Sequence, residues 1–173
     1  MISKIIASTI LFLALAPQGK QIAQEAPLSR FLLRQPCVNT GLSNWDIRRE
    51  DVSVGRAFYT SRLYMGAGDR YAALTCRLQP NKGGVIFQRL RLSYGMRDND
   101  VGSPGATVNI YVDGRKVSAL SRSILPGQKE SLALDVSNAK NVSLEVACSN
   151  QLRFCDRVYF WEADLEYAPL PKK

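Results

Sequence analysis

An alternation of apolar and polar residues with a period of two runs through most of this 173-residue chain. The segments that follow it are 72–78, 86–96, 108–112, 132–136, 142–148 and 159–167. Successive side chains of a β-strand point to opposite faces, so this period predicts half-buried strands with their apolar side inward. The pattern therefore favours an all-β fold.

Two of these segments assign aromatic residues to an inward face. In segment 86–96, the residues expected to share one face are Ile86, Leu90, Leu92, Tyr94 and Met96. In the last segment, the corresponding residues are Tyr159, Trp161, Ala163, Leu165 and Tyr167. This assignment makes Trp161 a core residue, and the alternative is an aromatic platform for a sugar ring.

Turn residues separate the expected strands. Asp113-Gly114 lies between Val108–Val112 and Val117–Leu120, and Asp-Gly is a strong signal for a two-residue hairpin. Clusters rich in glycine and proline mark further loops at 80–84, 98–105 and 125–127. About eight short strands separated by such turns predict a β-sandwich of the jelly-roll type.

The N-terminus has the features of a secretory signal peptide. Lys4 precedes an apolar run that ends in Ala14-Leu15-Ala16, and the run is too short to span a bilayer. We therefore expect a signal peptide at 1–16, no transmembrane segment, and a secreted or periplasmic protein.

The rest of the chain divides into three expected parts. Residues 17–36 contain three prolines and are expected to form a tether, with a short helix at 28–34. The sandwich is expected over 37–168, and a short C-terminal tail over 169–173.

Export makes the four cysteines candidates for disulfide bonds. Four cysteines allow three pairings, and we favour Cys148–Cys155, which closes a short loop, together with Cys37–Cys76. A zinc site would need closely spaced ligand pairs, but the chain has neither a Cys-x-x-Cys motif nor any histidine. No metal site is expected from these residues.

The absence of histidine also limits catalysis. It excludes Ser-His-Asp and Cys-His mechanisms and the commonest general base at neutral pH. Glycosidases use a pair of carboxylates, and no such pair stands out in the sequence. We therefore expect a protein that is not an enzyme.

The formal net charge of +8 is compatible either with an acidic partner or with a solvated surface that happens to be basic. An acidic polysaccharide or an anionic envelope surface would suit an exported protein. Nucleic acid is disfavoured because of export and because the basic residues are scattered along the strands instead of forming one run.

Three segments resemble the NPCBM family, the "novel putative carbohydrate-binding module" that is attached to many secreted glycosidases. They are GATVNIYVDGRKV (105–117), PGQKESLALDVSNAKNVSLEVACS (126–149) and CDRVYFWEADLEY (155–167). Asp156 and Ala163 match the aspartate and the alanine of the family's final strand. The resemblance implies a galactose-binding-domain-like β-sandwich that binds carbohydrate. Arg157 stands where the family has histidine, so its sugar contacts do not transfer directly.

A sugar site combines an aromatic face with charged or amide groups that hold hydroxyls. The candidate ligand-binding residues expected in the loops are Trp45, Tyr59, Tyr64, Arg97, Asp98, Asp100, Asp156 and Arg157. We expect Arg97–Asp100 and Asp156–Arg157 to converge at one rim of the sandwich. Asp98-Asn99-Asp100 also offers hard oxygens that could hold a calcium ion, although an acidic turn is the simpler interpretation.

These observations favour a secreted, non-catalytic, carbohydrate-binding protein, with an acidic polysaccharide of an envelope or matrix as the candidate ligand. The alternative is a structural or interaction domain that uses the same sandwich to bind a protein partner.

Overall fold

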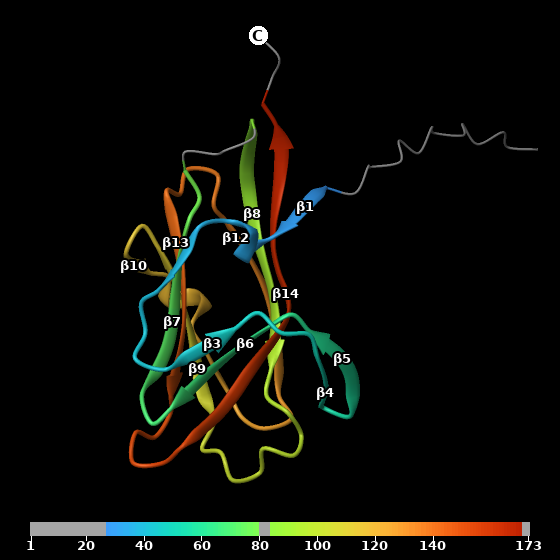
Figure 1. The fold of residues 1–173 in the computed structure, drawn as a ribbon, viewed down its shortest axis with the longest axis vertical. Coiled ribbons are helices and arrows are strands. Elements are labelled where there is room, and N and C mark those ends of the chain that lie inside the picture. The colour runs from blue at the N-terminus through green and yellow to red at the C-terminus, as the bar shows by residue number, and fades with distance from the viewer. Residues whose placement is uncertain (1–26, 80–83, 171–173) are drawn as a thin grey trace, which may run out of the picture.

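The computed structural model describes residues 27–79 and 84–170, so the expected signal peptide at 1–16 lies outside the described residues. Two six-stranded antiparallel sheets pack face to face as a β-sandwich, as the sequence predicts. In Figure 1 the sheet that holds β7, β9 and β13 lies to the left of the sheet that holds β8 and β14. A separate hairpin, β4–β5, projects to the right.

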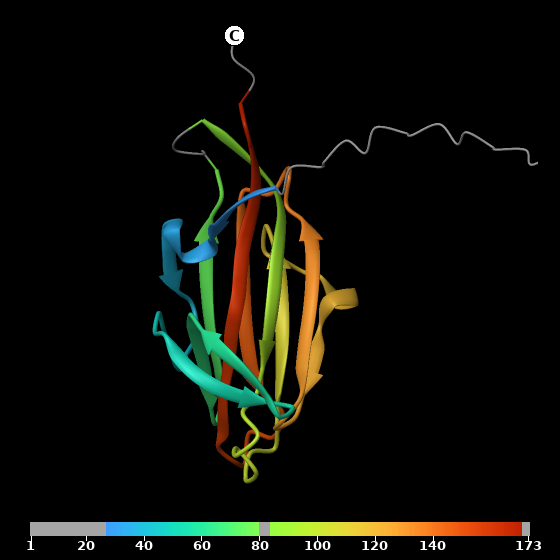
Figure 2. The same ribbon diagram turned by 90° about the vertical axis from the view of Figure 1, so that its right-hand side faces the viewer.

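The first sheet has the strand order β12-β8-β14-β6-β3, and β1 also pairs with β14. Its strands are β1 (Leu28–Phe31), β3 (Asn44–Asp46), β6 (Leu63–Gly68), β8 (Val85–Gly95), β12 (Lys129–Asp135) and β14 (Cys155–Pro169). The long strands β8 and β14 run side by side along the molecule (Figure 2).

The second sheet has the strand order β10-β9-β13-β7-β2, and β11 also pairs with β9. Its strands are β2 (Cys37–Asn39), β7 (Tyr71–Arg77), β9 (Ala106–Val112), β10 (Arg115–Lys116), β11 (Arg122–Ile124) and β13 (Asn141–Cys148). The separate hairpin consists of β4 (Glu50–Val54) and β5 (Ala57–Ser61), and two short 3-10 helices are η1 (Leu32–Arg34) and η2 (Ser118–Leu120).

The core lies between the two sheets and follows the predicted alternation. In β13 every second residue is buried: Val142, Leu144, Val146 and Cys148. Leu90 of β8 and Phe160 of β14 meet them from the first sheet and are fully buried. Burial of each such large side chain contributes about 1.5–3 kcal/mol, which makes this layer the main source of stability.

In the N-terminal half of the last strand, the prediction that Tyr159 and Trp161 face the main core is wrong. The pairing of β14 with β8 shifts between Phe160 and Glu162, so Trp161 is an extra residue in a β-bulge. The bulge turns Phe160 into the main core and places Tyr159 and Trp161 on the opposite side, in a second small cluster. Trp161 is therefore not a residue of the main core.

The prediction that Ile86 shares the inward face of β8 with Leu90 is wrong, because a second register shift lies between Glu166 and Tyr167 of β14. Arg89 pairs with Glu166 and Phe87 with Tyr167, so Gln88 is the extra residue on β8. Beyond this shift the inward residue is Phe87, whereas Ile86 is 37% exposed.

The Asp113-Gly114 hairpin is confirmed. Both residues have positive φ, +48° and +79°, as a two-residue turn of this type requires. The returning strand is shorter than predicted, because β10 has two residues and η2 replaces the strand expected at 117–120.

Residues 28–36 differ from the expected tether. β1 pairs with β14 in the register Leu28↔Tyr167 to Phe31↔Asp164, and Leu32 is fully buried. The expected helix at 28–34 is limited to the three residues of η1. At the other end, β14 extends to Pro169, where the tail was expected to begin.

Both favoured disulfides are present. Cys37–Cys76 joins directly paired residues of β2 and β7, with 4.0 Å between their Cα atoms. Cys148–Cys155 joins the end of β13 in one sheet to the start of β14 in the other. Two disulfides indicate an extracytoplasmic protein, because such bonds persist in oxidising compartments.

Within the described ranges, none of the helices has the length and apolar character needed to cross a membrane.

Candidate functional site

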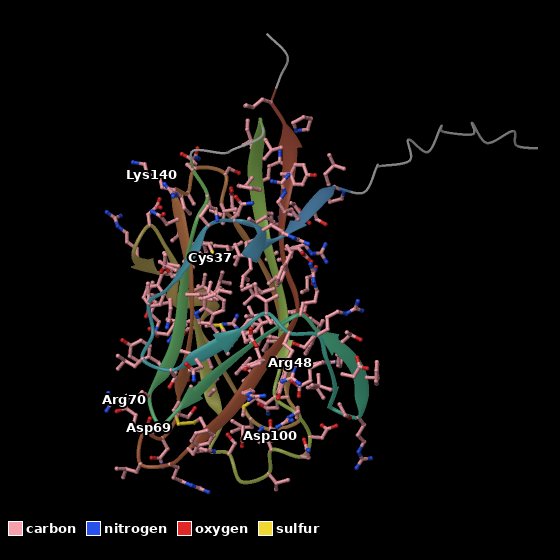
Figure 3. All side chains as sticks on the ribbon, in the orientation of Figure 1. Cys37, Arg48, Asp69, Arg70, Asp100 and Lys140 are labelled. Carbon is pink, nitrogen blue, oxygen red and sulfur yellow. A yellow bond between two sulfur atoms is a disulfide. The ribbon has the colours of Figure 1, made fainter. Side chains whose placement is uncertain are left out.

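A hollow of about 430 Å³ opens at one rim of the sandwich, and we call it the rim pocket. It is lined by Ser43, Asn44, Tyr64, Gly66, Gly68, Arg97, Phe154, Cys155, Asp156 and Arg157. These residues come from β6, from the start of β3 and the residue before it, from the start of β14 and the residue before it, and from the segment after β8. The loop that carries Asp100 lies at this end, at the bottom of the molecule in Figure 3.

Strand β6 forms the floor of the rim pocket. Its alternate residues Leu63, Met65 and Ala67 are fully buried in the core. Tyr64, Gly66 and Gly68 lie on the other side and line the pocket. Because glycine has no side chain, two of these three positions leave open space above the strand.

Arg157 is the more exposed of the two arginines that line the pocket. Its guanidinium lies over the ring of Tyr64, at 4.1 Å from the ring centre. Its Nη1 is 3.9 Å from Oε2 of Glu50, which is too long for a hydrogen bond. With its side chain 42% exposed, Arg157 can donate to a ligand.

Arg97 is held by the protein itself. Its Nε and Nη2 donate to Oδ1 of the Asp100 carboxylate at 3.1 and 2.7 Å. This hydrogen bond is the main cause that raises the pKa of Arg97. Asp100 is buried, and Arg97 also lies over the ring of Tyr159. The Arg97–Asp100 pair therefore supports the pocket wall more than it offers groups to a ligand.

Asp156 carries a carboxylate that accepts no hydrogen bond from the described residues. Its backbone N–H donates to the Ser103 hydroxyl at 3.0 Å, which fixes the position of the residue. Burial, followed by the negative charge of Asp100, raises the pKa of Asp156. The folded protein thus disfavours the ionised form of Asp156, and perturbed pKa values of this kind are common in functional sites.

Two contributors to the rim pocket were not predicted. Phe154 is 70% exposed and lies within the loop that the Cys148–Cys155 bridge closes. Asn44 is exposed at the start of β3. An aromatic residue directly before a cysteine of a short disulfide loop is a signal that could have identified Phe154.

Asp98 lies outside the rim pocket and stabilises the β4–β5 turn. Its carboxylate accepts hydrogen bonds from the Ser53 hydroxyl at 2.6 Å and from the N–H groups of Gly55 and Arg56 at 2.7 and 3.0 Å. Gly55 and Arg56 both have positive φ, so the turn benefits from this external support.

The carboxylates of Asp98 and Asp100, considered above as possible calcium ligands, face different partners. The carboxylate of Asp98 faces the β4–β5 turn, and that of Asp100 faces Arg97. Within residues 27–79 and 84–170, no three acidic or cysteine side chains are grouped as metal ligands.

Replacement of Asp98 by asparagine should destabilise the protein at neutral pH. The hydrogen bond from Ser53 is the main cause that lowers the pKa of Asp98, so its ionised form stabilises the fold. That contribution is present above the ordinary pKa of about 4 and is lost as the pH falls through the lower, folded-state pKa. Urea unfolding of wild type and Asp98→Asn at pH 7 and pH 3 should therefore show a stability difference that narrows in acid. Asp69→Asn, at an exposed aspartate, is the control, and a difference that is independent of pH would contradict the assignment.

Tyr59 and Trp45 lie apart from the rim pocket. Tyr59 stacks on Trp161 with ring centres 4.1 Å apart, and Lys129 covers it at 5.2 Å. Trp45 packs against the main core. Of the eight predicted ligand residues, the structure brings four together in the pocket: Tyr64, Arg97, Asp156 and Arg157.

Several solved carbohydrate-binding modules have a similar fold. A CBM51 module of GH95 from Clostridium perfringens, in complex with methyl-galactose, matches 80% of this chain over 99% of its own length, with a TM-score of 0.59 and 12% identity. CBM51-2 of ZmpB from the same organism, in complex with GlcNAc, matches 80% of this chain with a TM-score of 0.61 and 15% identity. The tandem CBM51 modules of Sp3GH98 from Streptococcus pneumoniae match 86%, with a TM-score of 0.60 and 11% identity.

This chain spans 31% of the ZmpB structure and 49% of the tandem-module structure, so it corresponds to one part of each. The sequence matches no protein-family model and no curated protein. At these identities the comparisons establish the shared β-sandwich fold.

Proposed function

We propose that this protein is a secreted, non-catalytic carbohydrate-binding protein whose rim pocket holds one sugar residue. The observation that carries the proposal is the presence of three groups in one hollow that a ligand can reach. They are the exposed ring of Phe154, the carboxylate of Asp156 and the guanidinium of Arg157. An apolar face beside a few convergent polar groups is the usual design of a small-ligand site.

Each group has a role in holding a sugar. The ring of Phe154 offers the apolar surface on which the C–H face of a pyranose packs. Asp156 accepts hydrogen bonds from sugar hydroxyls, and Arg157 donates to their oxygens. The side-chain amide of Asn44 can both donate and accept. The ring of Tyr64 is covered by Arg157 and acts by positioning that arginine.

The charge balance favours an uncharged sugar in the rim pocket. Two arginines, Arg97 and Arg157, face three carboxylates, those of Glu50, Asp100 and Asp156. A uronate would add a negative charge to this group. An acidic polysaccharide would therefore place a neutral residue in the pocket and its charged groups on the basic surface outside it. In that case salt weakens binding of the polymer more than binding of a single neutral sugar.

Other findings support the proposal. The similar modules were solved with methyl-galactose and GlcNAc, which are uncharged sugars. The disulfides fit the export that the signal peptide expected at 1–16 would direct. Membership of the NPCBM family belongs to the same proposal and is supported by the segments around Asp156 and by the fold.

The expected result is that Arg157→Ala weakens sugar binding by roughly ten- to a hundredfold, since charged hydrogen bonds contribute about 1.5–3 kcal/mol. A glycan array on the mature protein would identify the ligand, and calorimetric titration would measure its affinity. Arg70→Ala is the matched control, because Arg70 is exposed outside the pocket and uses only its backbone for hydrogen bonds. Equal affinities of wild type and Arg157→Ala would exclude the rim pocket as the site.

Protein binding is the second candidate, favoured by exposed apolar residues in the loops of the same rim. Val101, Leu152 and Phe154 are 82%, 95% and 70% exposed. The two loops that carry them are joined by the hydrogen bond from Arg153 to the carbonyl of Gly102. A wild-type protein that binds no glycan on the array would favour this alternative.

A further inference from the structure

A second hollow, of about 540 Å³, lies on the first sheet and shares no residue with the rim pocket. Arginine and apolar side chains dominate its lining, so we call it the basic groove. The residues that matter here are Phe31, Leu33, Arg34, Ile47, Arg49 and Arg62.

The strand pairing explains why the groove exists. On one side of β14, β6 pairs up to Phe160 and β1 pairs from Asp164 onward. The bulge at Trp161 falls between these two ladders. Neither β1 nor β6 therefore covers β14 in this interval, and the side chain of Arg62 enters it.

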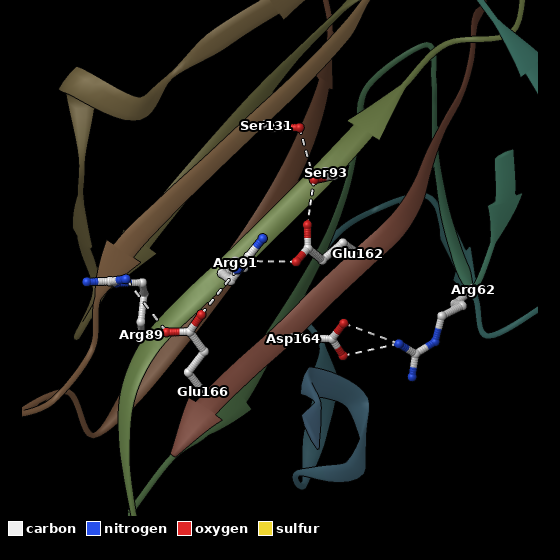
Figure 4. Close-up of polar contacts among 8 residues, drawn as sticks. All are labelled: Arg62, Arg89, Arg91, Ser93, Ser131, Glu162, Asp164 and Glu166. Carbon is white, nitrogen blue, oxygen red and sulfur yellow. Dashed lines mark hydrogen bonds and ion pairs between the residues drawn. The ribbon is translucent and has the colours of Figure 1, made fainter. Parts of the chain in front are cut away.

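Arg62 is partly neutralised there. Its Nη1 contacts both oxygens of Asp164, at 3.1 and 3.3 Å, as Figure 4 shows. Its guanidinium also lies over the ring of Phe31, at 4.0 Å from the ring centre. Arg62 thus has one carboxylate partner and keeps 40% of its side chain exposed.

Arg34 and Arg49 are not neutralised. Both are exposed and line the groove, and within the described residues neither has an ion pair or a side-chain hydrogen bond. None of the described residues that line the groove is acidic. The nearby Asp51 accepts a hydrogen bond from the Thr60 hydroxyl at 2.8 Å. The groove is therefore lined by three arginines, and of these only Arg62 has a carboxylate partner, Asp164, among the described residues.

The walls of the groove are aliphatic. Ile47 is 55% exposed, and Leu33 is partly buried against the core. The ring of Phe31 is covered by Arg62, so it offers no free face on which a sugar could stack. Such walls fit an alkyl chain better than a sugar ring.

We propose that the basic groove is a second binding site, for a small anionic amphiphile that carries a carboxylate or phosphate monoester on an aliphatic body. The planar guanidinium forks of Arg34 and Arg49 suit the two oxygens of such a head group. The aliphatic body lies against Leu33 and Ile47 and leaves water. The volume is that of a site for a small molecule.

Octyl phosphate, titrated below its micellar concentration, tests the proposal. Wild type should bind it, whereas 1-octanol, which has the same chain and neither charge nor sugar, and inorganic phosphate, which has no chain, should bind at least about tenfold more weakly. The double variant Arg34→Ala/Arg49→Ala and the variant Ile47→Ser should each lose roughly tenfold or more in affinity. Arg115→Ala, which removes one exposed arginine of β10 in the other sheet, should bind as wild type does.

Other outcomes would overturn the proposal. Equal binding of octyl phosphate and 1-octanol would show that charge plays no part, and full binding by the double variant would exclude the basic groove as the site. Binding to phosphatidylglycerol vesicles without binding of octyl phosphate would assign the arginines to a membrane surface instead. Arg157→Ala should leave octyl phosphate binding unchanged, so this test is independent of sugar binding in the rim pocket.

Discussion

Replacing Cys37 and Cys76 together by serine should lower the free energy of unfolding by about 4 kcal/mol. The bridge joins residues separated by 39 positions in the sequence, so its loss releases a long loop in the unfolded chain. It also removes a covalent link between β2, an edge strand, and β7. Urea unfolding of the oxidised wild type and of the double variant measures the difference.

The second bridge provides the comparison for this experiment. Cys148 and Cys155 are separated by only 7 positions. The loss of loop-closure entropy in the unfolded chain predicts that their bridge stabilises the fold by about 2.5 kcal/mol. The Cys148→Ser/Cys155→Ser variant should therefore lose less stability than the Cys37→Ser/Cys76→Ser variant. A reversed order would show that the Cys148–Cys155 link between the sheets contributes more than loop entropy.

Gly66→Phe should abolish sugar binding while the sandwich remains folded. A Cβ atom at Gly66 would lie 3.5 Å from Cγ of Arg157 and 3.8 Å from the carbonyl oxygen of Asn44, both ordinary contacts. A larger side chain would continue into the rim pocket that Gly66 lines. Phenylalanine is favoured in strands, so we expect a loss of affinity of about a hundredfold or more without unfolding. Calorimetric titration measures the affinity, and thermal unfolding checks the fold.

Gly66→Ala is the matched control for this prediction. Its added methyl group meets only the ordinary contacts above, so its affinity should stay within about threefold of wild type. If Gly66→Phe bound sugar normally, the ligand would lie elsewhere on the molecule. If Gly66→Ala lost binding as fully as Gly66→Phe, the pocket would be much tighter than its volume implies.

The alternation of apolar residues predicted the sandwich because most strands are buried on one side. For Val142, Leu144 and Val146 of β13, the alternation alone predicted burial correctly. The predicted faces were wrong next to two β-bulges, at Trp161 and at Gln88. A bulge inserts one residue, so the side chains on its two sides follow alternations that are out of step by one residue, and the residue types alone do not reveal it. The strand β1 was missed because its partner, β14, is far away in the sequence and the prolines nearby suggest a loop.

The candidate site could be predicted in part from the positions of charged residues relative to the strands. Charged residues near the strand ends pointed to the rim, and Tyr64, Arg97, Asp156 and Arg157 do meet there. The sequence could not show that Asp98 would clamp the β4–β5 turn, because that turn lies more than forty positions earlier in the chain. Although Asp98 and Asp100 are close in sequence, Asp98 binds the β4–β5 turn and Asp100 binds Arg97.

The Cys148–Cys155 bridge also has a consequence for when the rim pocket reaches its final form. Cys155 lines the rim pocket, and Phe154 is held in place by the loop that the bridge closes. The newly made, reduced chain lacks this constraint, so its pocket wall is not yet fixed. If the protein is exported and binds sugar in this pocket as proposed, recognition would be acquired by oxidation after export, and the precursor would not bind glycans in the compartment where it is synthesised.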